Sequence, residues 1–238
     1  MTEHIVSAYT DELEALSADI LRMGGLAEAM TGDACEATVK SDDTLATMVV
    51  ARDADVDALE ADIERRIIEI IARRQPLARD LREVLSALKI ANELERVGDL
   101  AKNIAKRAGV LEGFARRDVL KGIDRMGRAV TAQLSGVLDA FRNRDPARAT
   151  KFWISDEDVD QLYNSYFREV LTYMIEDPRT IGDCAHILFM AKNLERIGDH
   201  ATNIAEMIYF SVTGDYLSAD DRPKADELPS PMDEGTPL

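Results

Sequence analysis

The sequence LERVGDLAKNIA at residues 94–105 returns as LERIGDHATNIA at residues 194–205, an offset of 100. Nine of the twelve positions are identical. The positions that are kept include Glu, Arg, Gly, Asp and Asn, none of which the core of a helix requires. A repeat of this kind indicates that the chain is built from two homologous halves.

Each copy lies in a predicted helix whose apolar residues recur at alternating steps of three and four. A seam with this spacing is typical of helices that pack together in a bundle. The seam consists of Ala87, Ile90, Leu94, Val97, Ala101, Ile104 and Ala108 in the first half, and of Ile187, Met190, Leu194, Ile197, Ala201, Ile204 and Ile208 in the second.

The stretch before the first copy predicts two further helices. Apolar stripes indicate one helix over about residues 7–30 and another over about residues 33–74, with a candidate interruption near residues 40–43. The cluster Thr31-Gly32-Asp33 between them either breaks the helix or only kinks it. Pro76 ends the second of these helices, because the residue before a proline is disfavoured in the α region. The third helix then runs to about residue 111.

These earlier segments repeat as well, at an offset of 103. The segments RMG at 22–24 and DVDAL at 55–59 return as RMG at 125–127 and DVDQL at 158–162. We therefore expect an all-α fold of two tandem homologous three-helix bundles, with six long helices joined by short turns.

The repeat also predicts the domain boundaries. The first bundle should occupy residues 8–113 and the second residues 117–213. Residues 217–238 are rich in Asp, Glu, Pro and Ser and contain hardly any large apolar residue. Such a segment cannot bury enough apolar surface to fold, so we expect a disordered acidic tail.

Composition excludes several classes of protein. The net charge of -16 argues against a nucleic-acid-binding protein, which needs a basic surface to displace phosphate counterions. Cys35 and Cys184 stand alone, which suits two free cysteines in a reducing compartment. The chain shows neither the signature of a signal peptide nor a run of about 18 apolar residues. We expect a cytoplasmic protein that meets a membrane only through its partners.

Each copy of the repeat carries acids that the apolar seam does not explain. Residues four apart lie on one helix face, which at about 100° per residue lies away from the seam. Like charges at this spacing repel one another and slightly destabilise a helix. The stacked residues are Glu95, Asp99 and Asn103 in the first half, and Glu195, Asp199 and Asn203 in the second.

The preceding helix of each half supplies a second acidic pair with the same spacing. These pairs are Asp53 with Asp57, and Asp156 with Asp160. If the two helices are adjacent and the pairs are level, four carboxylates converge in each half. Oxygen ligands at this density suit Mg²⁺, Mn²⁺ or iron, and a bound ion would relieve the repulsion. The asparagines of the repeat are additional candidate ligands.

The plainer interpretation is a solvated acidic face, which would be preferred for a single pair of acids. The duplication of the pairs at matching positions favours the metal site. Gly98 and Gly198 strengthen it, because a glycine inside a helix costs about 1 kcal/mol and permits a close backbone approach. Tight helix packing explains these glycines equally well.

The sequence also contains arginines and a histidine in the repeat for which more than one role fits. Arg96 and Arg196 either bind a partner or form ordinary salt bridges within or between helices. His200 offers a nitrogen ligand, but its counterpart in the first half is Leu100.

No catalytic motif accompanies the acids. The sequence contains no Gly-rich phosphate loop, no G-x-S-x-G and no nucleophilic Cys/His pair. We therefore expect a protein that is not an enzyme. A metal-dependent phosphoesterase that uses the clustered carboxylates is the alternative, and a purely structural helical scaffold is a third.

The two copies of L-E-R-[VI]-G-D-x-A-x-N-I-A resemble the signature of the PhoU family of phosphate-transport regulators. The turn RQP at 74–76, DLR at 80–82 and RMG at 22–24 are also similar to that family. The resemblance covers about residues 8–213. It implies two three-helix bundles, often in a homodimer, with metal bound by the acidic pairs named above.

The resemblance also implies a function. The protein would be a cytoplasmic negative regulator of high-affinity phosphate uptake and of the phosphate-starvation response. Its partners would be the ATPase subunit of the phosphate ABC transporter and the phosphate sensor histidine kinase.

Overall fold

The computed structural model describes residues 2–111, 118–154 and 156–218, and the side chains within them except those of residues 2–8, 156 and 157. These residues form helices and short turns, and no strand occurs among them. The all-α prediction is therefore confirmed. The predicted acidic tail, beyond its first two residues, and the predicted domain boundary at 113–117 lie outside the described residues.

The helices form two groups that follow the sequence repeat. The first group contains α1 (Thr2–Lys40), α2 (Asp43–Arg74), α3 (Arg79–Ala108) and a 3-10 turn (Gly109–Leu111). The second group contains α4 (Lys121–Asn143), α5 (Pro146–Ile154), α6 (Asp156–Glu176), a 3-10 turn (Pro178–Thr180) and α7 (Ile181–Thr213). By their place in the repeat, α5 and α6 together correspond to α2.

The first helix is longer than predicted. A boundary between residues 30 and 33 was wrong, because Met30, Ala34 and Ala37 are buried in the core and their packing continues the helix to Lys40. The interruption near residues 40–43 is confirmed. Ser41 has a φ of 53°, and the carboxylate of Asp42 accepts the backbone N–H of Leu45 to cap α2.

The second half repeats this break in structural detail. Arg144 has a φ of 50°, and the carboxylate of Asp145 accepts the backbone N–H of Arg148 at 3.0 Å. These residues stand 103 positions after Ser41 and Asp42. The offset seen in the sequence therefore marks equivalent helix starts.

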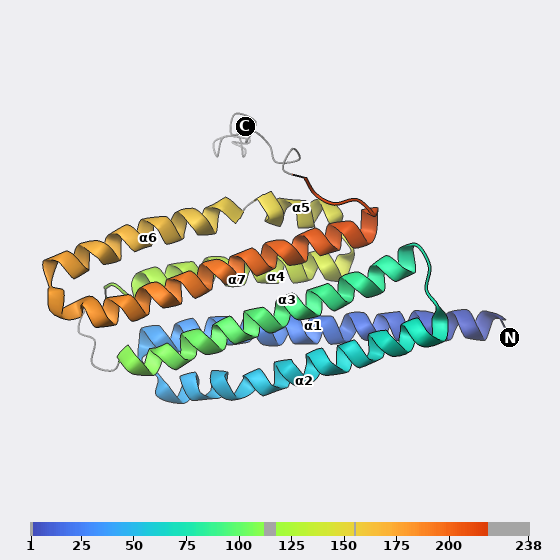
Figure 1. Cartoon of the computed structure of the whole chain (residues 1–238), viewed down its shortest axis with the longest axis horizontal. Coiled ribbons are helices and arrows are strands. Elements are labelled where there is room, and N and C mark those ends of the chain that lie inside the picture. The colour runs from blue at the N-terminus through green and yellow to red at the C-terminus, as the bar shows by residue number, and fades with distance from the viewer. Residues whose placement is uncertain (1, 112–117, 155, 219–238) are drawn as a thin grey trace, which may run out of the picture.

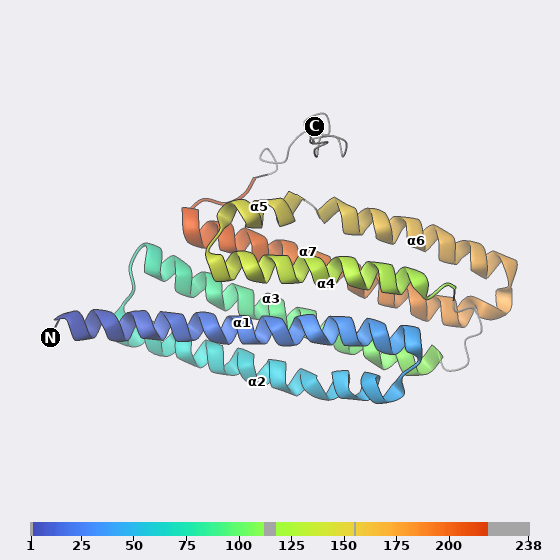
Figure 2. The same cartoon turned by 180° about the vertical axis from the view of Figure 1, so that it is seen from behind.

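All the long helices run along one axis in two layers, with α1–α3 in one layer and α4–α7 in the other (Figure 1). Between the layers, α3 packs against α7 and α1 packs against α4 (Figure 2). Every residue of both predicted apolar seams is buried, which confirms the predicted bundle core. Among the described residues, no helix is both long and apolar enough to cross a membrane.

Polar groups also join the two layers where α3 meets α7. Glu93 of α3 accepts two bonds through its Oε2 atom, from Nδ1 of His200 at 2.6 Å and from Nδ2 of Asn203 at 3.1 Å. Burial raises the pKa of Glu93, but the bonds from His200 and Asn203 outweigh it, and the net shift is downward. Further along, Arg107 lies 3.1 Å from Nδ1 of His186.

Close packing around α4 depends on glycine. A Cβ added at Gly122 would lie 2.0 Å from Cε2 of Tyr166. That ring is fully buried, and its hydroxyl donates to the carbonyl of Val119 at 2.6 Å, so it has little room to move. A Cβ added at Gly32 in α1 would meet nothing within 4 Å.

These two glycines predict opposite effects of the same substitution. Gly122→Ala should lower the free energy of unfolding by about 1–3 kcal/mol, because the added methyl overpacks the core. Gly32→Ala should raise it by up to about 1 kcal/mol, because alanine favours a helix interior. Urea unfolding followed by circular dichroism measures both. Equal shifts in the two variants would contradict the packing argument.

The bonds to Glu93 predict a pH-dependent contribution to stability. A carboxyl whose pKa is lowered by folding stabilises the protein above its ordinary pKa, and this contribution disappears as the pH falls through the folded pKa. Glu93→Gln should therefore cost about 1–3 kcal/mol at pH 7, and the deficit should shrink below about pH 4.5.

Unfolding curves of this variant across the pH range provide the measurement. Glu36→Gln is the matched control, since Glu36 forms an exposed ion pair with Lys40 that should contribute less than about 1 kcal/mol. A deficit in Glu93→Gln that stays constant down to pH 3 would show that the charge of Glu93 does not act in this way.

Candidate metal centre

The glycine of each repeat copy brings two acidic helices close together. A Cβ added at Gly98 would lie 3.3 Å from Cγ1 of Val56 in α2, and one added at Gly198 would lie 3.3 Å from Cγ1 of Val159 in α6. The same contact therefore occurs in both halves. It places α3 against α2 and α7 against α6, so that acids on the paired helices can face each other.

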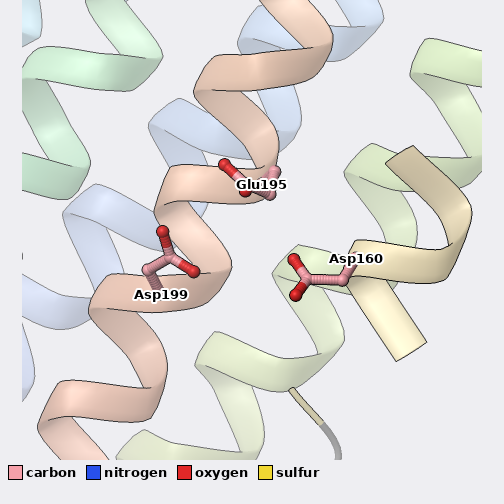
Figure 3. A group of neighbouring side chains, drawn as sticks. All are labelled: Asp160, Glu195 and Asp199. Atoms are coloured by element: carbon pink, nitrogen blue, oxygen red, sulfur yellow. The ribbon is translucent and has the colours of Figure 1, made fainter. Parts of the chain in front are cut away.

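In the second half three of the predicted acids converge. Asp160 reaches from α6 toward Glu195 and Asp199 on α7 (Figure 3). One carboxylate oxygen of each residue lies within 4.8 Å of the other two. Oxygen atoms bound to one Mg²⁺ at about 2.1 Å are separated by up to roughly 4.2 Å, so a small side-chain movement would let all three reach one ion.

The two oxygens of Glu195 have different environments. Oε1 accepts a hydrogen bond from the ammonium of Lys192, one turn earlier in α7. Oε2 is buried and has no hydrogen-bond partner among the described residues, and the whole side chain is only 12% exposed. A buried carboxylate oxygen without a donor is unfavourable. A cation bound between Glu195, Asp160 and Asp199 would satisfy it, so these residues fit a hard metal ion.

Other candidates of the second half have other contacts or are not described. The side chain of Asp156 is outside the described part of α6. The amide of Asn203 and the ring of His200 are both bonded to Glu93 in the layer interface, as described above. In the described part of the chain, Asn203 and His200 therefore contact Glu93 and are not grouped with Asp160, Glu195 and Asp199.

In the first half a lysine lies between the acids. The ammonium of Lys102 is 2.5 Å from Oδ2 of Asp53 in α2 and 2.6 Å from Oδ1 of Asp99 in α3. These two hydrogen bonds raise the pKa of Lys102 well above its ordinary value, so it is charged at neutral pH. Asp57 and Asn103 are exposed. Among the described side chains, no trio as close as that of the second half occurs here.

Glu95 shows that the acids of α2 and α3 do face each other. Its pKa is raised, first by burial and then by the negative charges of Asp99, Asp57 and Asp53, while Arg96 opposes the shift. The mutual repulsion expected from the sequence is therefore present in the first half.

The two arginines of the repeat are exposed. Nε of Arg96 lies 3.4 Å from Oε2 of Glu95 on the same helix, which fits the simpler salt-bridge interpretation. Binding of a partner by Arg96 or Arg196 stays a prediction.

Sequence reasoning missed Lys102 and Lys192, two lysines that contact candidate ligands of the acidic faces. A signal was available, because each lysine stands three residues from a candidate ligand and therefore shares its helix face. It also missed Glu93, whose counterpart in the second half is Asn193. No pattern within one helix could identify Glu93, because its partners are on the other bundle.

Comparison with known proteins agrees with this architecture. The PhoU domain matches twice, at residues 20–108 and 123–208. A protein of Caulobacter vibrioides named phosphate-specific transport system accessory protein PhoU homolog is 52% identical over 229 residues, which cover 96% of this chain and 99% of that protein. A homolog of the same name in Rhizobium meliloti is 48% identical and covers 94% of each chain.

Solved structures show the same fold. The crystal structure of PhoU from Pseudomonas aeruginosa matches with a TM-score of 0.83 and 39% identity, over 87% of this chain and all of that one. The phosphate transport system regulatory protein PhoU from Streptococcus pneumoniae matches with a TM-score of 0.80 and 26% identity, over 88% of this chain and 99% of that one. The two matched domains, the full-length relatives and the shared fold together establish that this chain belongs to the PhoU family.

Proposed function

We propose that this protein is a negative regulator of high-affinity phosphate uptake and of the phosphate-starvation response. The observation that carries the proposal is similarity over nearly the whole chain to proteins named as accessory to the phosphate-specific transport system. The regulator acts between the ATPase subunit of the phosphate ABC transporter and the phosphate sensor histidine kinase. With ample phosphate, it keeps the kinase from activating its response regulator.

The proposed setting follows from these partners. Both present surfaces to the cytoplasm, where the regulator reaches them without a membrane span of its own. It works as a homodimer. Its exposed arginines of the repeat, Arg96 and Arg196, are candidate contacts for a partner.

The protein also binds a divalent or iron-type metal ion, Mg²⁺, Mn²⁺ or iron, on its acidic bundle faces. The support comes from the trio in the second half and from the unsatisfied Oε2 atom of Glu195. A bound ion replaces repulsion among three carboxylates with attraction, and so it stabilises the packing of α6 on α7. It also lowers the negative charge that a partner meets on this face.

A metal-dependent phosphoesterase is the second candidate, favoured by the close grouping of three carboxylates. It is distinguished by turnover of a phosphate ester such as p-nitrophenyl phosphate with Mg²⁺, Mn²⁺ or iron. If the protein hydrolyses the ester and this turnover disappears in Asp99→Ala and Asp199→Ala, the protein is an enzyme and the regulatory proposal is rejected. Metal binding without turnover favours the regulator.

Deletion of the gene tests the regulatory proposal. A phosphate-responsive reporter should remain active in high phosphate in the deleted strain, because nothing restrains the kinase. The wild-type gene should restore repression. If the reporter still shuts off in high phosphate without the gene, the protein is not the negative regulator.

Removal of one proposed ligand tests the metal. Glu195→Gln keeps the shape of the side chain but removes its charge, so the second-half trio should bind Mn²⁺ at least about tenfold more weakly. Titration calorimetry of metal-free protein measures the affinity. Glu206→Gln is the matched control on the same helix, since Glu206 accepts a bond from Trp153 at 2.7 Å and is not part of the trio. Equal Mn²⁺ affinity in the two variants would reject this site.

A further inference from the structure

We propose that the ammonium of Lys102 is the resident cation of the first acidic face, so that only the second half of the protein takes up a metal ion. The inference rests on the metal binding proposed for the second half. It makes the two homologous bundles chemically different, with one acidic face neutralised by the chain itself and the other neutralised by an ion from solution.

The position of Lys102 is that of a bridging ion. It stands on α3, and its Nζ atom contacts one carboxylate of its own helix, Asp99, and one of α2, Asp53, at 2.6 Å and 2.5 Å. The ammonium therefore joins the same two helices that a metal would join. The side chain is only 20% exposed, so its stem is packed along the helix pair and its charge is held between the acids.

The second half has no lysine at the matching position. Thr202 stands 100 residues after Lys102, and its side chain is uncharged. Its hydroxyl donates to the carbonyl of Gly198 at 3.2 Å and lies 3.3 Å from Nε2 of Gln133 in α4. It therefore supplies no positive charge to Asp160, Glu195 and Asp199.

Lys192 forms an ion pair within one helix, whereas the ion pairs of Lys102 join two helices. It is on the same helix as Glu195, donates to the Oε1 atom of that residue, and is 48% exposed. Its ammonium also lies 5.3 Å from the centroid of the Tyr163 ring, and the charge of Asp199 acts on it. It leaves Oε2 of Glu195 buried without a hydrogen-bond partner. Oε2 of Glu195 is thus an oxygen that an external cation can join, while Asp53 and Asp99 of the first half are bridged by Lys102.

A metal ion and the Lys102 ammonium exclude each other. Both need oxygens of Asp53 and Asp99, and two cations at this separation repel strongly in a partly buried site. Entry of a metal would also displace a charged group from both of its hydrogen bonds. The metal supply therefore changes the charge and rigidity of the α6–α7 face and leaves the α2–α3 face unaltered.

The test removes the ammonium in a protein whose second-half trio is disabled. Mn²⁺ alone is the probe, and its binding is measured by calorimetry and by metal analysis after gel filtration. Four proteins are compared: wild type, Glu195→Gln, and Glu195→Gln combined with either Lys102→Thr or Lys106→Thr. Lys106 is exposed and one turn further along α3, so its loss makes the same change in net charge without opening the acidic cluster.

The expected result is that Glu195→Gln loses Mn²⁺ binding and that adding Lys102→Thr restores it, with an affinity at least about tenfold above that of the Lys106→Thr combination. Lys102→Met, which keeps the packed stem, should restore binding as well if the threonine variant is unstable. Melting temperatures in EDTA and in Mn²⁺ check folding, and Mn²⁺ should raise the melting temperature of each Lys102 variant.

Three outcomes would overturn the inference. One is a Glu195→Gln protein that still binds Mn²⁺ through first-half acids with Lys102 in place. The second is a folded Lys102 variant that gains no site, and the third is equal gain in the Lys106→Thr combination. Failure of the proposed second-half site appears separately, as a wild type that binds no Mn²⁺. In that case a gain of Mn²⁺ binding with Lys102→Thr still supports the assignment of Lys102 as the cation of the first acidic face.

Discussion

The close approach of paired helices at Gly98 and Gly198 is the constraint on which the rest of the structure depends. Without a side chain at these positions, Val56 and Val159 reach the backbone of α3 and α7. Acids of both helices are then brought together in each half, and in the first half the ammonium of Lys102 lies between two of them. The glycines of the repeat therefore set the distance between the helices that carry the acids.

The same helices also hold the two bundles together. The apolar seam of α3 and α7 fills each bundle core, while Glu93 on α3 accepts bonds from His200 and Asn203 on α7. Three faces of one helix thus serve three purposes, namely the core, the acidic face and the layer interface. On α7 the acidic face and the layer interface lie side by side, since Asp199 directly precedes His200 in the chain.

The halves have diverged at positions that decide chemistry rather than fold. Lys102 is matched by Thr202, Leu100 by His200, and Glu93 by Asn193. None of these differences disturbs the buried seam, so the fold tolerates them. They nevertheless give one half an internal ammonium and the other a trio of carboxylates with a buried, unsatisfied oxygen. This asymmetry gives the protein two acidic faces of different charge.

The helical bundles follow from the amino-acid pattern alone, because a seam with steps of three and four has to be buried and a repeat has to fold twice in the same way. The sequence also identified the acids that lie on a common helix face, including Asp160, Glu195 and Asp199. It misplaced the end of α1, since the burial of Met30, Ala34 and Ala37 in the core continues the helix past Thr31 and Gly32. Only the tertiary structure decided which acids meet, that Lys102 lies between two of them, and that Asn203 and His200 turn to Glu93. These outcomes depend on distances between helices, and no periodicity within one helix specifies what stands across from it.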